Sequence, residues 1–336
     1  MDKKQCVVFV LICFLFIGGC SNDDREKHQR SRKNTVYTKE YIKEIVIEDV
    51  LIGNSASLYL LDKYLIVRDP RNPEEQIHIF NKNTFEHLKS TAPLGQGPDE
   101  ITRIGHIGVD NARKNIYVID AARYKVFSYQ IDSLITSPYY SPKVKTTFKI
   151  EQIPRWFYYI NDTLSIGMFV LPTSASTFNI SVSRWNMVSG KIESMPYTNP
   201  RIKRKRIDLA VSPELNLYVE CYRHNDLITI CSLDGQLKYN IYGPNWNDEN
   251  SNDNRYFGDV QFCKDKIVVS YFEKTYGEDD GTTTTLLVFN LTGDYIKTLN
   301  VGYRVRNLCY DKENNRLLFV FDDEIQFGYL PLDNLI

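Results

Sequence analysis

Short apolar segments with the alternation of β-strands recur along the chain after residue 40. The most regular of them repeat about every fifty residues. They occupy residues 64–67, 116–119, 163–166, 217–219, 267–269 and 318–320. Each is followed, after a polar turn, by a second apolar segment, at residues 77–80, 125–129, 180–185, 227–230, 286–289 and 324–327. No stretch keeps an apolar stripe at helical spacing, so the pattern predicts an all-β chain of six repeated units.

A further strand fits before and after each of these pairs, which gives about four strands per unit. Four-stranded sheets repeated at this period are typical of a β-propeller, whose ring leaves only short sheet edges. The last unit has no room for an outer strand, whereas residues 41–47 (YIKEIVI) form a spare one. We therefore predict a six-bladed β-propeller of antiparallel blades over residues 41–336, closed by the N-terminal strand in the last blade.

The stretch from Pro93 to Asp110 contains Gly95-Gln96-Gly97, which invites comparison with a phosphate-binding loop. A dinucleotide fingerprint needs a third glycine at position 100, where this chain has Glu100. The glycines are therefore expected only to allow a tight turn between blades. Residues 94–129 resemble an NHL repeat in the order of GxGP-x-E, VD, IYV-D and KVF-x-Y. The whole pattern is similar to TolB-like six-bladed propeller lipoproteins of anaerobic Gram-negative gut bacteria, a resemblance that implies an envelope location and no particular chemistry.

The N-terminus has the features of an export signal. Two lysines precede an apolar run at residues 7–17, which is too short to span a bilayer. The run ends in Ile17-Gly18-Gly19-Cys20, which resembles the lipobox of bacterial lipoproteins. Residues 1–19 are thus predicted to be a signal peptide. The resemblance implies that Cys20 carries acyl chains such as palmitate.

Ser21 follows Cys20 where an Asp would resemble an inner-membrane retention signal. The acidic residues after it resemble the export signal of surface lipoproteins. We expect a lipid-anchored outer-membrane protein facing the cell surface, with a periplasmic orientation as the alternative. Residues 20–40 contain few apolar side chains and are predicted to be the lipidated Cys and a flexible tether.

Composition narrows the function classes. The net charge of −1 makes nucleic acid an improbable partner, because binding to it needs a surplus of cations. Four of the seven cysteines remain after Cys20, without C-x-x-C spacing, and are interpreted as buried thiols. The five histidines have no metal-ligand spacing, and no G-x-S-x-G occurs. No cofactor, metal site or catalytic residue is predicted.

Arginines precede the inner strands of five of the six predicted blades. Guanidinium groups gathered at one mouth of the central shaft would bind carboxylate, sulfate or phosphate. Trp156 lies beside one of them and offers a surface on which a sugar ring could stack; packing between blades is the alternative for all of these residues. The candidate ligand-binding residues are Arg103, Arg155, Trp156, Arg206, Arg255 and Arg304.

Together these features favour a propeller that binds a ligand or protein without converting it. An anionic glycan or an envelope protein is the expected partner, in addition to the membrane. A propeller enzyme, such as a lactonase or lyase acting on glycans, is the first alternative, and a structural subunit of an envelope complex is the second. Carboxylates and Asn converging on the shaft would favour metal-dependent catalysis, whereas Arg and aromatic side chains would favour binding.

Overall fold

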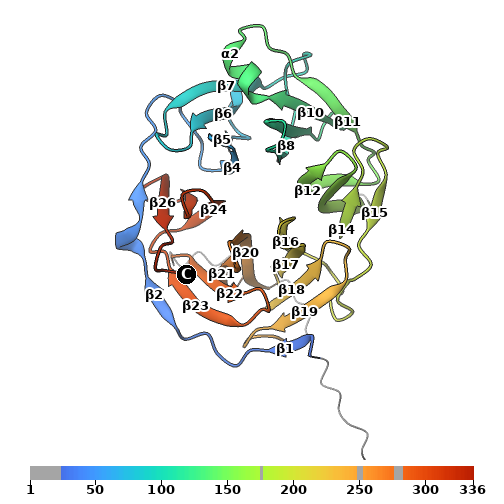
Figure 1. Cartoon of the computed structure of the whole chain (residues 1–336). Helices are drawn as coiled ribbons and strands as arrows, with labels where there is room; N and C mark the ends of the chain where they lie inside the picture. The colour runs from blue at the N-terminus through green and yellow to red at the C-terminus, as the bar shows by residue number, and fades with distance from the viewer. Residues whose placement is uncertain (1–23, 175–176, 248–252, 276–282) are drawn as a thin grey trace, which may run out of the picture.

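The blades of the protein surround a central axis in the computed structural model, which describes residues 24–336 apart from 175–176, 248–252 and 276–282 (Figure 1). The predicted signal peptide and Cys20 lie outside the described residues. Blade one contains β4 (Ser57–Leu61), β5 (Tyr64–Arg68), β6 (Glu75–Asn81) and β7 (His87–Pro93). Blade two contains β8 (Ile104–Asp110), β9 (Asn115–Asp120), β10 (Lys125–Gln130) and β11 (Lys143–Thr147), with the short helix α2 (Ile131–Thr136) before β11. Blade three contains β12 (Ile153–Asn161), β13 (Leu164–Pro172), β14 (Phe178–Trp185) and β15 (Ile192–Ser194).

The second half of the ring repeats this arrangement. Blade four contains β16 (Ile207–Ser212), β17 (Leu217–Tyr222), β18 (Leu227–Ser232) and β19 (Leu237–Tyr242). Blade five contains β20 (Asn254–Cys263), β21 (Lys266–Thr275), β22 (Thr285–Asn290) and β23 (Tyr295–Asn300). Blade six contains β24 (Val305–Asp311), β25 (Arg316–Phe321) and β26 (Phe327–Pro331). The predicted six-bladed, antiparallel all-β fold is confirmed.

The ring closes where the N-terminal segment joins blade six. β3 (Lys43–Glu44) pairs antiparallel with β26, and the Ile45 N–H donates to the Phe327 carbonyl at 3.0 Å. The closing strand is thus confirmed within the predicted residues 41–47. β26 itself begins at Phe327, later than the predicted 324–327, because Asp322 and Asp323 lie in a turn that binds two arginines.

Residues 24–38 form a strap along the outer edges of two blades, so the predicted flexible tether over residues 20–40 is wrong for this part of it. Residues 20–23 lie outside the described residues. β1 (Glu26–His28) pairs in parallel with β19, and β2 (Thr35–Tyr37) pairs in parallel with β23. Blades four and five therefore have five strands each. The sequence of the strap gives no apolar signal because its backbone provides much of the binding, through the unpaired N–H and C=O groups of the sheet edges. The 3₁₀ turn η2 (Lys39–Tyr41) then leads to β3.

The hydrophobic core is a ring of six clusters, one between each pair of adjacent blades. Between blades two and three, for example, the rings of Tyr117 and Tyr159 lie with their centroids 4.6 Å apart, and Tyr117 shares a core cluster with the fully buried Trp185. Packing between blades rather than within one sheet holds the inner strands around the axis. Among the described residues, no helix is both long and apolar enough to cross a membrane.

The glycine pair of the β7–β8 connection makes a bend, as predicted. The Glu100 carboxylate folds back to accept a hydrogen bond from the Gly97 N–H at 2.6 Å. A Cβ on Gly95 would lie 2.0 Å from this carboxylate, so a larger residue at position 95 would displace the Glu100 side chain from the bend. The loop encloses its own side chain and leaves no cradle of free N–H groups for a phosphate.

Candidate functional site: the central shaft

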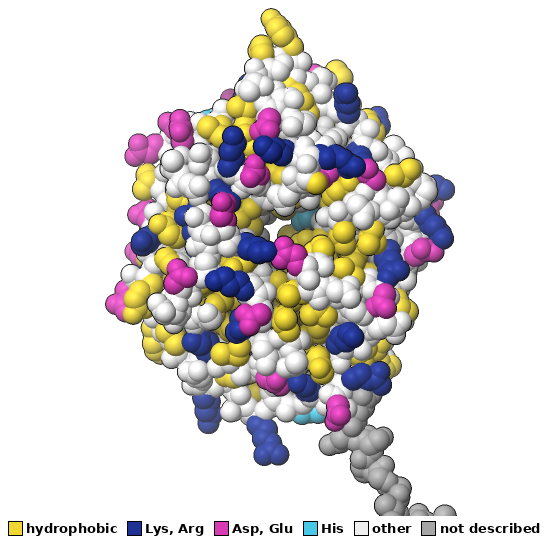
Figure 2. Space-filling model, viewed as in Figure 1, with side chains coloured by type: hydrophobic (Ala, Val, Ile, Leu, Met, Phe, Trp, Pro, Cys, Tyr) yellow, Lys and Arg dark blue, Asp and Glu magenta, His cyan; other side chains and the backbone are white. Residues whose placement is uncertain are grey.

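A cavity of about 510 Å³ runs along the axis of the ring. It is lined by residues of the inner strands β4, β8, β12, β16, β20 and β24, so every blade contributes to it. Figure 2 shows it as a hollow at the centre of one face, with charged side chains around its rim. The volume is within the range of ligand pockets in proteins. The shaft is therefore the candidate site.

β-bulges in four of the inner strands set the direction of the side chains that line this cavity. In β8, Gly105 and His106 lie opposite the single residue Ile119, and in β20 Gly258 and Asp259 lie opposite Ser270. The register also shifts by one residue in β12 before Trp156 and in β24 before Asn307. Bulges re-aim side chains and are frequent beside functional sites. Here they accompany four polar or aromatic residues of the same cavity.

Aromatic rings from blades one to three form one wall. The His106 ring lies 4.2 Å from the Trp156 ring and 5.2 Å from Tyr59, between centroids. Tyr158 donates a hydrogen bond from its hydroxyl to the Leu209 carbonyl at 3.0 Å, which joins this wall to blade four. Within the described part of the chain, the buried Tyr59 hydroxyl and Trp156 N–H make no hydrogen bond of good geometry. This wall thus combines stacking surface with polar atoms that a ligand could satisfy.

His106 is neutral in this environment. Burial lowers the pKa of its imidazole well below the usual value, and the positive charge of Arg68 lowers the pKa further. Its Nδ1 accepts a hydrogen bond from the Phe157 backbone N–H at 3.4 Å. His106 is therefore a stacking partner of Trp156 rather than a cation.

Carboxylate and amide groups from blades four to six form the opposite wall. Asp259 accepts hydrogen bonds from the Asn307 side chain at 2.7 Å and from the Leu308 N–H at 3.3 Å. Burial, together with the negative charge of Asp208, raises the pKa of Asp259 to about 6. Asp208 itself accepts two hydrogen bonds from the guanidinium of Arg223, at 2.7 and 2.6 Å. The wall therefore contains one carboxylate neutralised by Arg223 and one that titrates near neutral pH.

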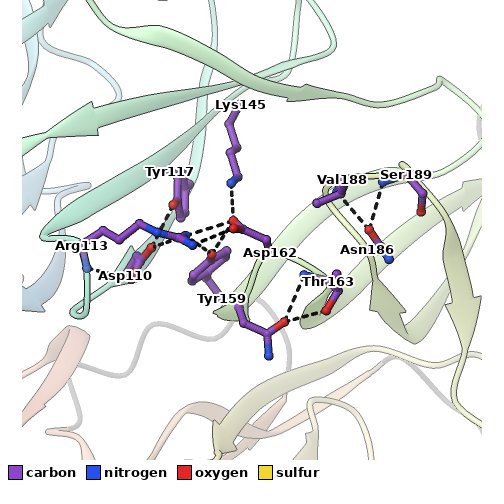
Figure 3. Close-up of polar contacts among 11 residues, drawn as sticks. Asp110, Arg113, Tyr117, Lys145, Tyr159, Asp162, Thr163, Asn186, Val188 and Ser189 are labelled. Carbon is purple, nitrogen blue, oxygen red and sulfur yellow. Dashed lines mark hydrogen bonds and ion pairs between the residues drawn. The ribbon is translucent and has the colours of Figure 1, made fainter.

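A network of charged groups supports the aromatic wall from outside the cavity (Figure 3). Asp162 of blade three accepts hydrogen bonds from the Arg113 guanidinium and the Tyr159 hydroxyl, both at 2.7 Å, and pairs with Lys145. These contacts hold the pKa of the Asp162 carboxyl well below its usual value. Because Arg113 and Lys145 belong to blade two, the network fixes the position of blade three and of Tyr159, which lines the cavity.

None of the predicted arginines lines the cavity; Trp156 does. The arginines lie where the inner strands begin. Arg206 packs on Phe178 and Arg255 on Phe272, with ring centroids 4.1 and 4.0 Å from the guanidinium carbons. The structure thus brings Trp156 into the shaft and gives these two arginines aromatic neighbours.

The other predicted arginines have different surroundings. Arg304 lies 4.0 Å from the Asp323 carboxylate, and Arg103 is exposed, with its backbone N–H bound to Asp120. Arg155, the extra residue of the β12 bulge, also reaches solvent.

Positive charge is nevertheless concentrated where blades three and four meet. Desolvation lowers the pKa of Arg155, and the positive charges of Arg223 and Arg206 lower it further, against the opposite effect of Asp208. The pKa of Arg206 is also lowered, by burial and by Arg204. Guanidinium groups that lower one another's pKa in this way would be stabilised by a bound anion.

The residues that sequence reasoning missed are His106, Asp259, Asn307 and Tyr59. Strand alternation could not have assigned His106, Asp259 and Asn307 to the shaft, because the bulge beside each changes which face the following residues occupy. Tyr59 lies in β4, whose register is regular, so a bulge does not explain why it was missed. The four cysteines after Cys20 are free thiols: Cys221, Cys231 and Cys263 are buried as predicted, whereas Cys309 is partly exposed and lines the cavity. In the described part of the chain, no group of three or more His, Cys, Asp or Glu side chains could hold a metal ion.

Comparisons with known proteins agree with this fold. A family model described as a 6-bladed beta-propeller matches residues 24–159, a range that includes the strap. A putative exported protein from Bacteroides fragilis has a similar structure, with 13% identity, a TM-score of 0.53, and coverage of 88% of this chain and 87% of that chain.

Two further solved structures are similar over most of their length. A member of the DUF4221 family from Bacteroides vulgatus has 10% identity and a TM-score of 0.56, over 87% of this chain and 98% of that one. A gluconolactonase from Xanthomonas campestris has 11% identity and a TM-score of 0.51, over 80% of this chain and 81% of that one. At these identities the likeness concerns the fold alone. No curated protein matches the sequence significantly.

Proposed function

We propose that the protein is an envelope lipoprotein that binds a saccharide in its central shaft without converting it. The observation that carries this proposal is the composition of the cavity, in which the aromatic wall around Trp156 faces the polar wall of Asp259 and Asn307. A sugar ring has an apolar face that stacks on aromatic side chains and hydroxyl groups that bind carboxylates and amides. The putative exported protein from Bacteroides fragilis supports the envelope location, and TolB-like membership and acylation of Cys20 in the outer membrane are parts of the same proposal.

Asp208, Asp259 and Asn307 meet the expectation stated for catalysis, whereas the aromatic wall meets the expectation stated for binding. Binding is favoured because both carboxylates already have protein partners. Asp208 is held in a bidentate pair with Arg223, and Asp259 is held by Asn307 and the Leu308 N–H. The positive charge around Arg155 and Arg206, which lie beyond the lining of the cavity, favours an acidic saccharide whose carboxylate extends to these residues. A hydroxyl group of the ligand donates best to an ionised Asp259. Affinity should therefore rise with pH through about 6.

The proposal is tested by probing an array of neutral and uronic-acid oligosaccharides with the wild-type protein, Trp156→Ala and Asp259→Asn. Loss of a stacking contact of this kind costs about 1–3 kcal/mol, or roughly 5- to 150-fold in affinity. Tyr139→Ala is the matched control, since Tyr139 is 93% exposed and lies outside the cavity. Binding that survives Trp156→Ala unchanged would place the ligand elsewhere. Uronic-acid binding that survives Arg155→Ala would show that Arg155 does not recognise the carboxylate. Equal binding of neutral and uronic-acid oligosaccharides would leave a neutral saccharide as the ligand class.

A sugar lactonase is the second candidate function. Asp259 favours it, because a carboxyl that titrates near neutral pH in a cavity is suited to general acid–base chemistry. Incubation with a sugar lactone, with and without divalent cations, tests this function. Hydrolysis that Asp259→Asn abolishes would establish the enzyme in place of the binding protein.

A further inference from the structure

We infer that the strap of residues 24–38 is a membrane-docking surface, which holds the propeller with its outer rim, at blades four and five, against a lipid bilayer. The inference rests on the proposed acylation of Cys20. It adds to that proposal an orientation of the body, which a flexible tether would leave unspecified.

The strap is fixed to the propeller by side chains as well as by its backbone. The Arg32 guanidinium forms an ion pair with Asp226 at 2.9 Å, and both side chains are almost completely buried. Glu26 accepts hydrogen bonds from Asn240 and from the Tyr242 hydroxyl, both at 2.6 Å. The strap therefore moves with the body of the protein, so the position of one specifies the position of the other.

The distance along the chain between Cys20 and the strap is short. Only residues 21–23 separate Cys20 from Asp24, where the described part of the chain begins. A fully extended chain spans at most about 3.3–3.6 Å per residue, so Asp24 lies no more than about 15 Å from Cys20. The next residue, Arg25, accepts a hydrogen bond at its carbonyl from the Asn240 N–H of β19 at 2.7 Å. Acyl chains on Cys20 would therefore bring the outer edge of blade four close to the lipid headgroups.

The exposed side chains of the strap suit such a surface. Arg25, Arg30 and Lys33 are exposed, and cations near a membrane surface are attracted to anionic lipids. Tyr37 on the strap is 73% exposed, and Tyr41, which lies just beyond the strap in η2, is 51% exposed. Tyrosine side chains are enriched at the level of the headgroups. Basic and aromatic residues are thus combined on the one segment that the anchor brings to the bilayer.

This arrangement has a consequence for the shaft. The strap follows the rim of the ring, past β19 and β23, rather than either face (Figure 1). With the rim on the bilayer, the axis of the shaft runs along the membrane plane. Neither mouth is then blocked by lipid, and a soluble saccharide can enter from the side.

The test uses the full acylated chain, reconstituted into vesicles of phosphatidylethanolamine and phosphatidylglycerol that contain brominated lipids. A fluorophore is attached at Ser31→Cys on the strap or, as the matched control, at Tyr139→Cys in blade two, both in a Cys309→Ser background. Both positions are exposed. We expect quenching at residue 31 to exceed quenching at residue 139 several-fold. Adding Arg30→Glu and Lys33→Glu should reduce that difference while the protein stays on the vesicles.

Equal quenching at the two positions, or stronger quenching at residue 139, would overturn the docking surface. Failure of the acylation proposal gives a different result. If the chain is not acylated, mass spectrometry will find an unmodified Cys20 and salt will release the protein from the vesicles. That result would refute the lipid anchor rather than the orientation of the propeller.

Discussion

Replacing Arg32 with Ala should destabilise the protein strongly, although Arg32 lies in a segment whose sequence looks like a linker. The Arg32 and Asp226 side chains are 6% and 0% exposed, so the substitution leaves a buried carboxylate without its cation. Breaking a buried ion pair on one side costs about 3–5 kcal/mol. The guanidinium carbon also lies 5.0 Å from the Tyr271 ring centroid, a contact worth about 0.5–2 kcal/mol. We expect the free energy of unfolding to fall by about 3–5 kcal/mol.

Urea unfolding followed by circular dichroism measures this change. Lys33→Ala is the matched control, since Lys33 is exposed and its loss should change the free energy of unfolding by no more than about 0.5 kcal/mol. The double variant Arg32→Ala with Asp226→Asn should recover part of the loss, because it removes the uncompensated charge. A loss below about 1 kcal/mol in Arg32→Ala would mean that the strap is not held as described, and it would remove the basis of the membrane orientation.

Three further perturbations test the packing of the ring. The pKa of Asp162 is lower in the folded protein, so this carboxylate contributes stability above the pKa of the unfolded chain, and that stability is lost as pH falls through the folded-state pKa. Asp162→Asn should therefore make the free energy of unfolding fall less steeply at acidic pH. An unchanged dependence on acidic pH would contradict this role. Gly108→Ala places a Cβ 2.2 Å from a ring carbon of Phe157 and should lower the free energy of unfolding by about 1–3 kcal/mol. Gly190 has a positive φ but no atom near the position of a Cβ, so Gly190→Ala should lower the free energy of unfolding less in the same thermal melts. Deleting residues 24–38 should expose the edges of β19 and β23 and cause aggregation in light scattering, and a monomeric deletion variant would refute the strap as an edge cover.

The sequence was sufficient to predict the blades because each strand buries apolar side chains at a regular period. Val67, Val118 and Val219, each in the second strand of its blade, are all fully buried, and the closing strand before blade one was identified from its own apolar alternation. The strap was missed because its stability comes from backbone pairing and from partners distant in sequence. Arg32, for example, meets Asp226, and no local pattern links the two residues.

The candidate site was predicted only in part. Trp156 was identified as a surface for a sugar, and it lines the shaft. The arginines were placed by counting back from each strand, which gives the position of the backbone but not the direction of a side chain. His106 and Asp259 were not predicted, because each lies in a β-bulge, which changes the direction of the side chains in a way that strand alternation does not show.

The most direct test of the account is a fluorescence titration that reports on the shaft alone. Trp185→Phe and Trp246→Phe leave Trp156 as the only tryptophan of the three. The titrant is the oligosaccharide that scores highest on the array. Occupation of the shaft predicts a saturable change in Trp156 emission with the same midpoint as binding measured by calorimetry. Calorimetric binding with unchanged Trp156 emission would place the ligand outside the shaft and contradict the proposed function.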